Sequence, residues 1–145
     1  MDARRKRTER IFWTDQNRKI LKEVSMQVIV TVRGESLDMP VDPRFGRARY
    51  FILVNTDTNE TTVHDNTQNL NAAQGAGIQA AETVARLGAE AVISGNVGPK
   101  AFRTLSAAGI KVYLCPDGTV AEAIRRFQAG ELAAVTAASV EGHWA

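Results

Sequence analysis

Short runs of consecutive apolar residues alternate along this chain with stretches in which apolar residues are spaced three or four apart, the spacing that forms a stripe on one side of a helix. Runs rich in β-branched residues, such as QVIVTVR, are typical of strands buried on both faces. We expect strands at residues 27–33, 50–56, 61–65, 91–94 and 111–115. Apolar positions three or four residues apart predict helices at residues 73–87, 99–108 and 119–129. A glycine directly follows each stripe, as is common where helices end. The pattern from Met26 onward therefore predicts a β-β-β-α-β-α-β-α order.

This order favours an α/β domain over residues 26–145. Strands and helices alternate in its second half, which indicates parallel pairing through right-handed crossovers. The residues DTNE, between the second and third strands, predict a hairpin. Residues 132–135 are expected to form a short returning segment, and their pattern favours neither a helix nor a strand.

The predicted topology also indicates where a site would lie. If the first, fourth and fifth strands are parallel, their carboxyl ends share one edge of the sheet, and the hairpin brings the end of the third strand there. Ligands of open α/β sheets bind at this edge. Four loops converge on it, at residues 34–48, 66–75, 95–98 and 115–118.

The loop GNVGPK at residues 95–100 offers backbone N–H groups at the start of a helix. Such a helix start attracts anions, and Pro99 stands at the favoured first helical position. The spacing does not match the nucleotide-binding P-loop, because Gly98 precedes Pro99 and Ala101 follows Lys100. A simple glycine turn before a proline-started helix is the more economical interpretation of this motif alone.

The stretch DPRFGRARYF at residues 42–51 carries the most unusual pattern. Phe45 is expected to fill the core. Gly46 is expected at a position where the backbone needs a residue without a side chain. Arg44, Arg47 and Arg49 lie close together in this stretch, and guanidinium groups suit carboxylates, phosphates and other anions. The alternative is that they are surface charges or partners of nearby aspartates.

Metal ligands are few in this sequence. Cys115 is the single cysteine, and His64 and His143 are the only histidines, so the chain alone supplies no His/Cys cage. A lone cysteine at a strand end is more often a small buried hydrophobe than a ligand. The carboxylates are scattered, which disfavours a two-metal nuclease or hydrolase.

Charge separates the N-terminus from the rest. Residues 1–25 hold eight basic and four acidic side chains, whereas the remaining residues hold ten and twelve. The net charge of +2 therefore belongs to a basic N-terminal extension, partly helical or disordered, and a nucleic-acid-binding globular face is disfavoured. We expect a cytoplasmic protein without a membrane segment, because no apolar run is long enough to span a bilayer.

Taken together, three stretches resemble the dinitrogenase iron–molybdenum cofactor biosynthesis family. They are DPRFGRARYFILV, GAGIQAAETVARLGAEAVISGNVGPKAF and LSAAGIKVYLCPDGTVAEAIRRFQAGEL, at residues 42–54, 75–102 and 105–132. The resemblance implies an RNase-H-like three-layer α/β fold, in which a five-stranded mixed sheet carries helices on both faces. It also implies non-catalytic binding or carriage of an iron–molybdenum or other metal–sulfur cluster, or a precursor, with a cluster-assembly protein as partner.

The sequence departs from this family at one position. Many relatives have His where this chain has Arg44, and an arginine stays protonated and does not ligate metals. Arg44 would instead pair with an anionic cluster. The alternative is an adaptor or regulatory module of the same fold that binds a protein partner or a small anion. The candidate contacts are Arg44, Gly46, Arg47, Asn69, Asn71, Gly95, Asn96, Gly98 and Cys115, the last as a soft metal ligand.

Overall fold

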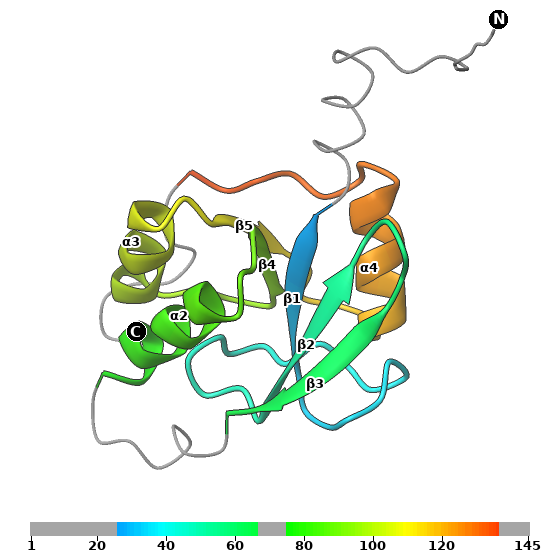
Figure 1. Ribbon diagram of the computed structural model, residues 1–145, viewed down its shortest axis with the longest axis horizontal. Helices are drawn as coiled ribbons and strands as arrows, with labels where there is room; N and C mark the ends of the chain where they lie inside the picture. The colour runs from blue at the N-terminus through cyan, green and yellow to red at the C-terminus, as the bar shows by residue number, and fades with distance from the viewer. Residues whose placement is uncertain (1–25, 67–74, 137–145) are drawn as a thin grey trace, which may run out of the picture.

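The computed structural model describes residues 26–66 and 75–136, and these form one five-stranded sheet with three helices (Figure 1). The strand order is β3-β2-β1-β4-β5. The strands are β1 (Gln27–Val32), β2 (Tyr50–Asn55), β3 (Thr61–Asp65), β4 (Ala91–Ser94) and β5 (Lys111–Leu114). β1, β4 and β5 are parallel, whereas β2 is antiparallel to both β1 and β3. The predicted strands and the mixed sheet are confirmed.

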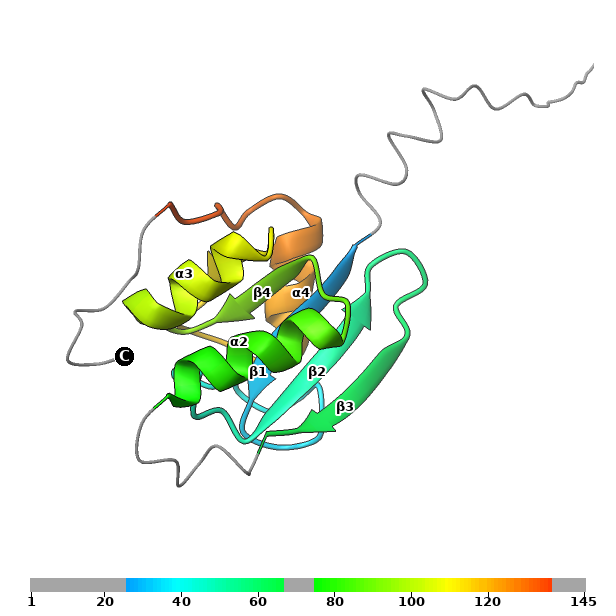
Figure 2. The ribbon, with the colours of Figure 1, turned by 60° about the vertical axis from the view of Figure 1, so that its left-hand side comes forward.

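The helices are α2 (Ala76–Arg86), α3 (Pro99–Ala107) and α4 (Val120–Gln128). The predicted helices are confirmed, and most of the differences in their bounds are capping residues. Residues 73 and 74, where the first was expected to begin, lie outside the described residues. α2 and α3 lie side by side on one face of the sheet and α4 covers the other (Figure 2). The layers are therefore helix, sheet and helix, as predicted.

Two hydrophobic cores explain why the strands read as continuous apolar runs. Ile29, Phe51 and Val92 pack under α2 and α3. Their chain neighbours face α4, because successive side chains of a strand point to opposite faces. Both faces of the central strands are thus buried, and all positions from Val28 to Val32 are at most 1% exposed.

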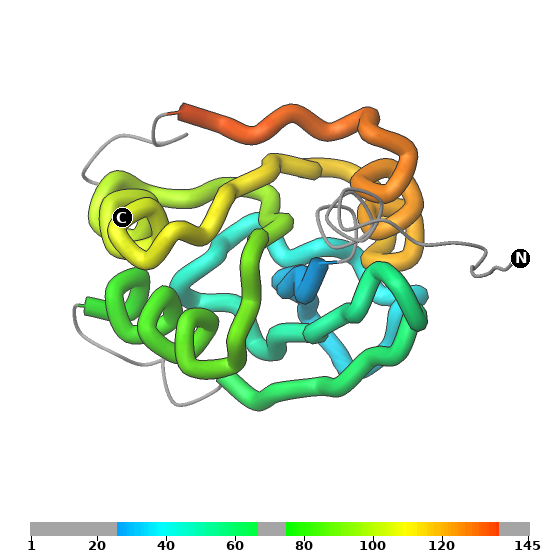
Figure 3. The backbone as a smooth tube through the Cα atoms, turned by 45° about the horizontal axis from the view of Figure 1, so that its top comes forward, coloured from blue at the N-terminus to red at the C-terminus, as the bar shows by residue number. Residues whose placement is uncertain are grey.

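The segment after α4 returns along β5 (Figure 3). The Val135 N–H donates to the Val112 carbonyl at 2.8 Å, and Tyr113 and Ala134 form an isolated antiparallel bridge. The expected short segment at residues 132–135 is thereby confirmed, and it covers the β5 edge of the sheet. None of the helices in the described part of the chain is long and apolar enough to cross a membrane.

α4 begins with a capping box, in which two side chains satisfy orphan N–H groups at the helix start. The Thr119 hydroxyl accepts from the Glu122 N–H at 3.2 Å, and the Glu122 carboxylate accepts from the Thr119 N–H at 2.9 Å. The hydrogen bond from the Thr119 backbone lowers the pKa of Glu122, and Arg126 and Arg125 add to this effect. The ionised carboxylate therefore stabilises the folded state.

We expect the stability advantage of the wild type over Glu122→Gln to depend on pH. The pKa of Glu122 is lower in the folded protein than the ordinary 4.5. The advantage is therefore fully present above pH 4.5 and is lost as pH falls through the lowered value. Urea unfolding of both proteins at pH 7 and pH 3 measures this change. Glu82→Gln, at an exposed position of α2, is the control. If its free energy of unfolding showed the same pH-dependent difference from the wild type, the assignment of the effect to the cap would be contradicted.

Candidate anion-binding site at the sheet edge

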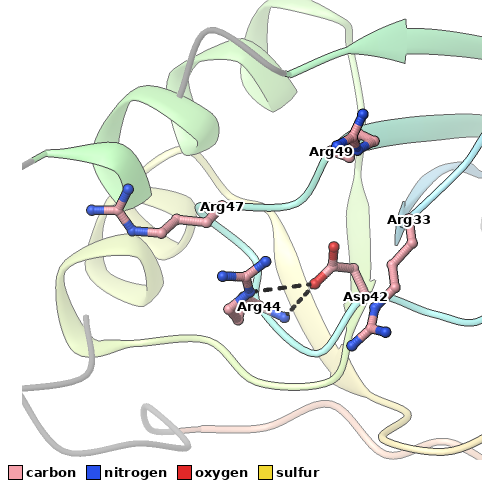
Figure 4. A pocket seen from close by; sticks show the side chains of 5 residues that line it. All are labelled: Arg33, Asp42, Arg44, Arg47 and Arg49. Carbon is pink, nitrogen blue, oxygen red and sulfur yellow. Dashed lines mark hydrogen bonds and ion pairs between the residues drawn. The ribbon is translucent and has the colours of Figure 1, made fainter. Parts of the chain in front are cut away.

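Five side chains line an open hollow of about 190 Å³ at the carboxyl edge of the sheet (Figure 4). They are Arg33, Asp42, Arg44, Arg47 and Arg49. Arg33 directly follows β1, and the others come from the segment that leads into β2. Four guanidinium groups and one carboxylate leave a formal excess of three positive charges. The arrangement suits an anionic guest, since guanidinium groups present several donors in a fixed plane.

Asp42 is the buried member of the hollow, with a relative exposure of 2%. Its carboxylate accepts a hydrogen bond from the Arg44 backbone N–H at 3.0 Å, and the Arg44 Nε atom lies 3.8 Å from the same oxygen. The Arg44 side chain is 63% exposed. In Figure 4, Asp42 lies between Arg44 and Arg33, while Arg47 extends away from it. Asp42 therefore orients Arg44 and offsets part of the positive charge.

The backbone of Asp42 fastens the segment to the centre of the sheet. Its N–H donates to the Thr31 carbonyl at 2.9 Å, and its carbonyl accepts from the Thr31 hydroxyl at 2.9 Å and from the Gly95 N–H at 3.2 Å. The Thr31 and Ser94 hydroxyl oxygens, both fully buried, lie 3.0 Å apart. The loop after β1 and the loop after β4 are thus joined at the base of the hollow.

Asn66 holds the other end of the arginine segment. Its side-chain amide donates to the Ala48 carbonyl at 2.8 Å and to the Gly46 carbonyl at 3.3 Å, and its backbone N–H donates to the Arg49 carbonyl at 2.9 Å. Phe45 is buried at 3% exposure and stacks on Phe51, with ring centroids 5.9 Å apart. Phe45 fills the core as predicted, and the arginines beside it are left facing the hollow.

Two of the predicted glycines allow close backbone contacts. A Cβ atom on Gly46 would come within 2.8 Å of the Gly77 backbone, and one on Gly95 within 2.6 Å of the Pro43 Cα atom. Gly98 precedes α3 in an extended conformation, and Pro99 is the first helical residue, as predicted. Asn96 is exposed in the same loop. None of these positions is among the residues that line the hollow, whereas Arg44 and Arg47 are.

Cys115 lies elsewhere. It is 1% exposed and belongs to the core on the α4 face, where its thiol donates to the Asp117 carbonyl at 3.2 Å and accepts from Arg126 at 3.6 Å. The structure does not bring it to the hollow. Asn69 and Asn71 lie outside the described residues. Among residues 26–66 and 75–136, no three His, Cys, Asp or Glu side chains gather as a potential metal site.

The sequence did not single out every residue at this site. Arg33 was missed, although its position at the carboxyl end of the first strand was a usable signal. Arg49 and Asp42 belong to the same stretch as Arg44 and Arg47 but are not among the predicted contacts. Thr31 and Ser94 gave no signal, because hydroxyl residues inside strand patterns are common and their pairing depends on the β1–β4 register.

Asp42→Asn is expected to change stability and anion binding in opposite directions. The free energy of unfolding should fall by about 1 kcal/mol, because a buried hydrogen bond to a charged group becomes a neutral one. Anion affinity should rise, because the hollow loses its competing negative charge. Urea unfolding and anion titration measure the two effects. Asp38→Asn, an exposed change in the same loop, should alter neither, and a parallel fall in stability and affinity in Asp42→Asn would contradict this role.

Known proteins resemble the part of the chain that holds the sheet and the hollow. The family model described as dinitrogenase iron-molybdenum cofactor matches residues 26–130. An uncharacterized protein from Methanocaldococcus jannaschii is 31% identical over 116 residues, which cover 79% of this chain and 95% of that protein. The apo form of the orange protein from Desulfovibrio gigas superposes with a TM-score of 0.78 and 40% identity, covering 80% of this chain and 98% of that chain. A protein from Thermotoga described as a NifB protein of the DUF35 family superposes with a TM-score of 0.70 and 38% identity, covering 79% of this chain and 97% of that chain.

Proposed function

The chain belongs to the dinitrogenase iron-molybdenum cofactor family, and from this membership we propose that it binds a pre-formed anionic metal–sulfur cluster, or a precursor of one. The proposed site is the arginine hollow, and the proposed role is carriage without catalysis. The observation that supports it is that four of the five residues lining one open hollow at the sheet edge are arginines.

The residues of the hollow fit such a guest by charge and not by ligation. Among the described lining residues there is no thiol or imidazole, and arginine does not ligate metals. A cluster that already carries its own sulfide ligands needs only charge neutralisation and hydrogen-bond donors from the chain. Arg33, Arg44, Arg47 and Arg49 supply both, and Asp42 sets the position of Arg44.

Non-covalent binding also suits a carrier. Salt weakens the binding of a guest that is held by partly exposed guanidinium groups. Such a guest can also leave without the breaking of a metal–protein bond. We propose a cluster-assembly protein as the partner that supplies or receives it. The structure of the orange protein is described as an apo form, which implies a ligand-bound form of that protein and supports the proposal of a bound guest here.

Anaerobic reconstitution tests the proposal. The full chain is incubated with iron, molybdate and sulfide, separated from small molecules by gel filtration, and examined by absorption spectroscopy and metal analysis. We expect visible absorption and metal to elute with the protein and to decrease as the salt concentration rises. Protein that stays colourless and metal-free, both after reconstitution and when purified from its own source without oxygen, would overturn the proposal.

Binding of a small anion without metal is the second candidate function, and the absence of a soft ligand among the described lining residues favours it. Calorimetric titration with sulfate and phosphate distinguishes the two functions. Saturable sulfate binding by a chain that retains no metal would support the second candidate over the first.

A further inference from the structure

The two edges of the sheet differ in their surroundings. The β5 edge is covered by the segment that contains Ala134 and Val135. At the other edge, β3 pairs with β2 on one side only, and no strand pairs with its outer side among the described residues (Figure 1). An unpaired edge presents N–H and C=O groups that can pair with another strand.

The register identifies which residues of β3 face outward. The Asn66 N–H donates to the Arg49 carbonyl and the Asn55 N–H donates to the Glu60 carbonyl, at either end of the β2–β3 ladder. Hydrogen-bonded positions alternate along an antiparallel pair. Thr62 and His64 therefore bond to β2, while the backbone groups of Thr61 and Val63 point away from it.

Val63 also has an unusual side chain for an open edge. Val63 is 41% exposed, which is the highest value among the exposed large hydrophobic residues that the structure describes; Leu37 and Ile78 follow at 37% each. Exposed edges are commonly protected by lysine, proline or a bulge, and the sequence TTVHD of β3 has neither lysine nor proline.

We propose that β3 pairs antiparallel with β3 of a second copy of this chain, with Val63 facing the second Val63 across a two-fold axis. This register joins the outward groups of Val63 to those of its equivalent and covers both valine side chains. It sets Thr62 opposite His64 and Thr61 opposite Asp65, so hydroxyl groups face the imidazole and the carboxylate and no like charges meet. Shifting the register by two residues in either direction leaves only three of the five β3 residues paired with β3 of the second copy, with His64 opposite His64 in one case and Thr62 opposite Thr62 in the other.

The proposed dimer joins two five-stranded sheets into one continuous sheet. Its two arginine hollows face opposite directions, because the paired strands run antiparallel. The contact is small, since β3 has five residues, and stable protein interfaces bury more than about 1,000 Å². The dimer is therefore a concentration-dependent one.

Two measurements on the full chain test this pairing. Sedimentation velocity from about 10 μM to about 1 mM, chosen to bracket a weak interface, should show a shift from monomer to dimer. Val63→Lys sets two like charges opposite each other and should abolish the shift, whereas Ile78→Lys, a matched exposed hydrophobic residue on α2, should leave it unchanged. Val63→Cys should form a disulfide-linked dimer on mild oxidation, because paired residues in adjacent strands lie within disulfide reach. Ile78→Cys is the control, and the native Cys115 is buried.

Backbone amide exchange gives an independent measurement. The Val63 amide should exchange more slowly as protein concentration rises, while the Thr62 and His64 amides, bonded to β2, should be slow throughout. A monomer at every concentration overturns the proposal, as does a dimer that Val63→Lys leaves intact. Equal cross-linking of the Val63→Cys and Ile78→Cys variants also overturns it, as does a Val63 amide that is already protected in the dilute monomer.

Discussion

Replacing Arg33 and Arg44 together by glutamine is expected to weaken retention of the metal–sulfur guest about 100-fold. The two side chains flank Asp42 in the hollow. A hydrogen bond to a charged group contributes about 1.5–3 kcal/mol, and partial exposure places these arginines at the lower end of that range. About 1.4 kcal/mol corresponds to a tenfold change in affinity, so each arginine accounts for about tenfold. Metal retained after gel filtration, measured against protein concentration, gives the apparent affinity.

Arg86→Gln is the matched control for this pair. Arg86 is the last residue of α2, so it lies toward the opposite edge of the sheet, and its loss should change retention less than twofold, since long-range charge is screened by salt. The single variants Arg33→Gln and Arg44→Gln should each show about a tenth of the wild-type affinity. If the double variant binds as tightly as the wild type while Arg86→Gln weakens binding, the guest occupies another surface.

Gly95→Ala is expected to lower the free energy of unfolding by about 2–3 kcal/mol. The added methyl group would lie 2.6 Å from the Cα atom of Pro43, and no side-chain rotation relieves a contact with backbone. Overpacking of this kind in a buried position costs about 1–3 kcal/mol. The same shift would stretch the 3.2 Å hydrogen bond from the Gly95 N–H to the Asp42 carbonyl. Guest binding should therefore weaken together with stability.

Asn96→Ala provides the comparison one residue away. Asn96 is exposed, and surface substitutions usually change stability by less than about 0.5 kcal/mol. Urea unfolding of the three proteins measures the difference. A Gly95→Ala variant as stable as Asn96→Ala would show that the loop and Pro43 separate easily, and that the two loops are not held as one unit.

Local sequence signals were sufficient for most of the fold. The β-branched runs of β1 and β4 mark strands buried on both faces, and Gly88, Gly109 and Gly130, which follow the three helices, adopt positive φ angles of 83°, 77° and 76°. These features depend on neighbouring residues alone. The sheet edge that holds the hollow could be located in the same way, since the strand order determines which loops converge.

The side-chain composition of the hollow depended on information that local patterns lack. Arg33 joins Arg44 only because the loop after β1 folds back, with Val41 bridging to Val32. Cys115 illustrates the opposite case. It shares the α4 face with Tyr113, two residues earlier, whereas Val112 and Leu114 face α2 and α3. The period of two along a strand could have placed Cys115 away from the hollow, had the facing of β5 been known.

The position of Asp42 has a consequence for unloading. A hollow lined by arginines alone would hold any polyanion tightly at low salt and release it slowly. The buried Asp42 carboxylate lies beside Arg44 in the structure, so the protein itself already neutralises part of the positive charge of the hollow. The difference in free energy between the loaded and the empty state is thereby reduced. Under the proposed carrier function, a partner protein of modest affinity can then remove the guest, because the emptied hollow keeps its internal pairing of Arg44 with Asp42.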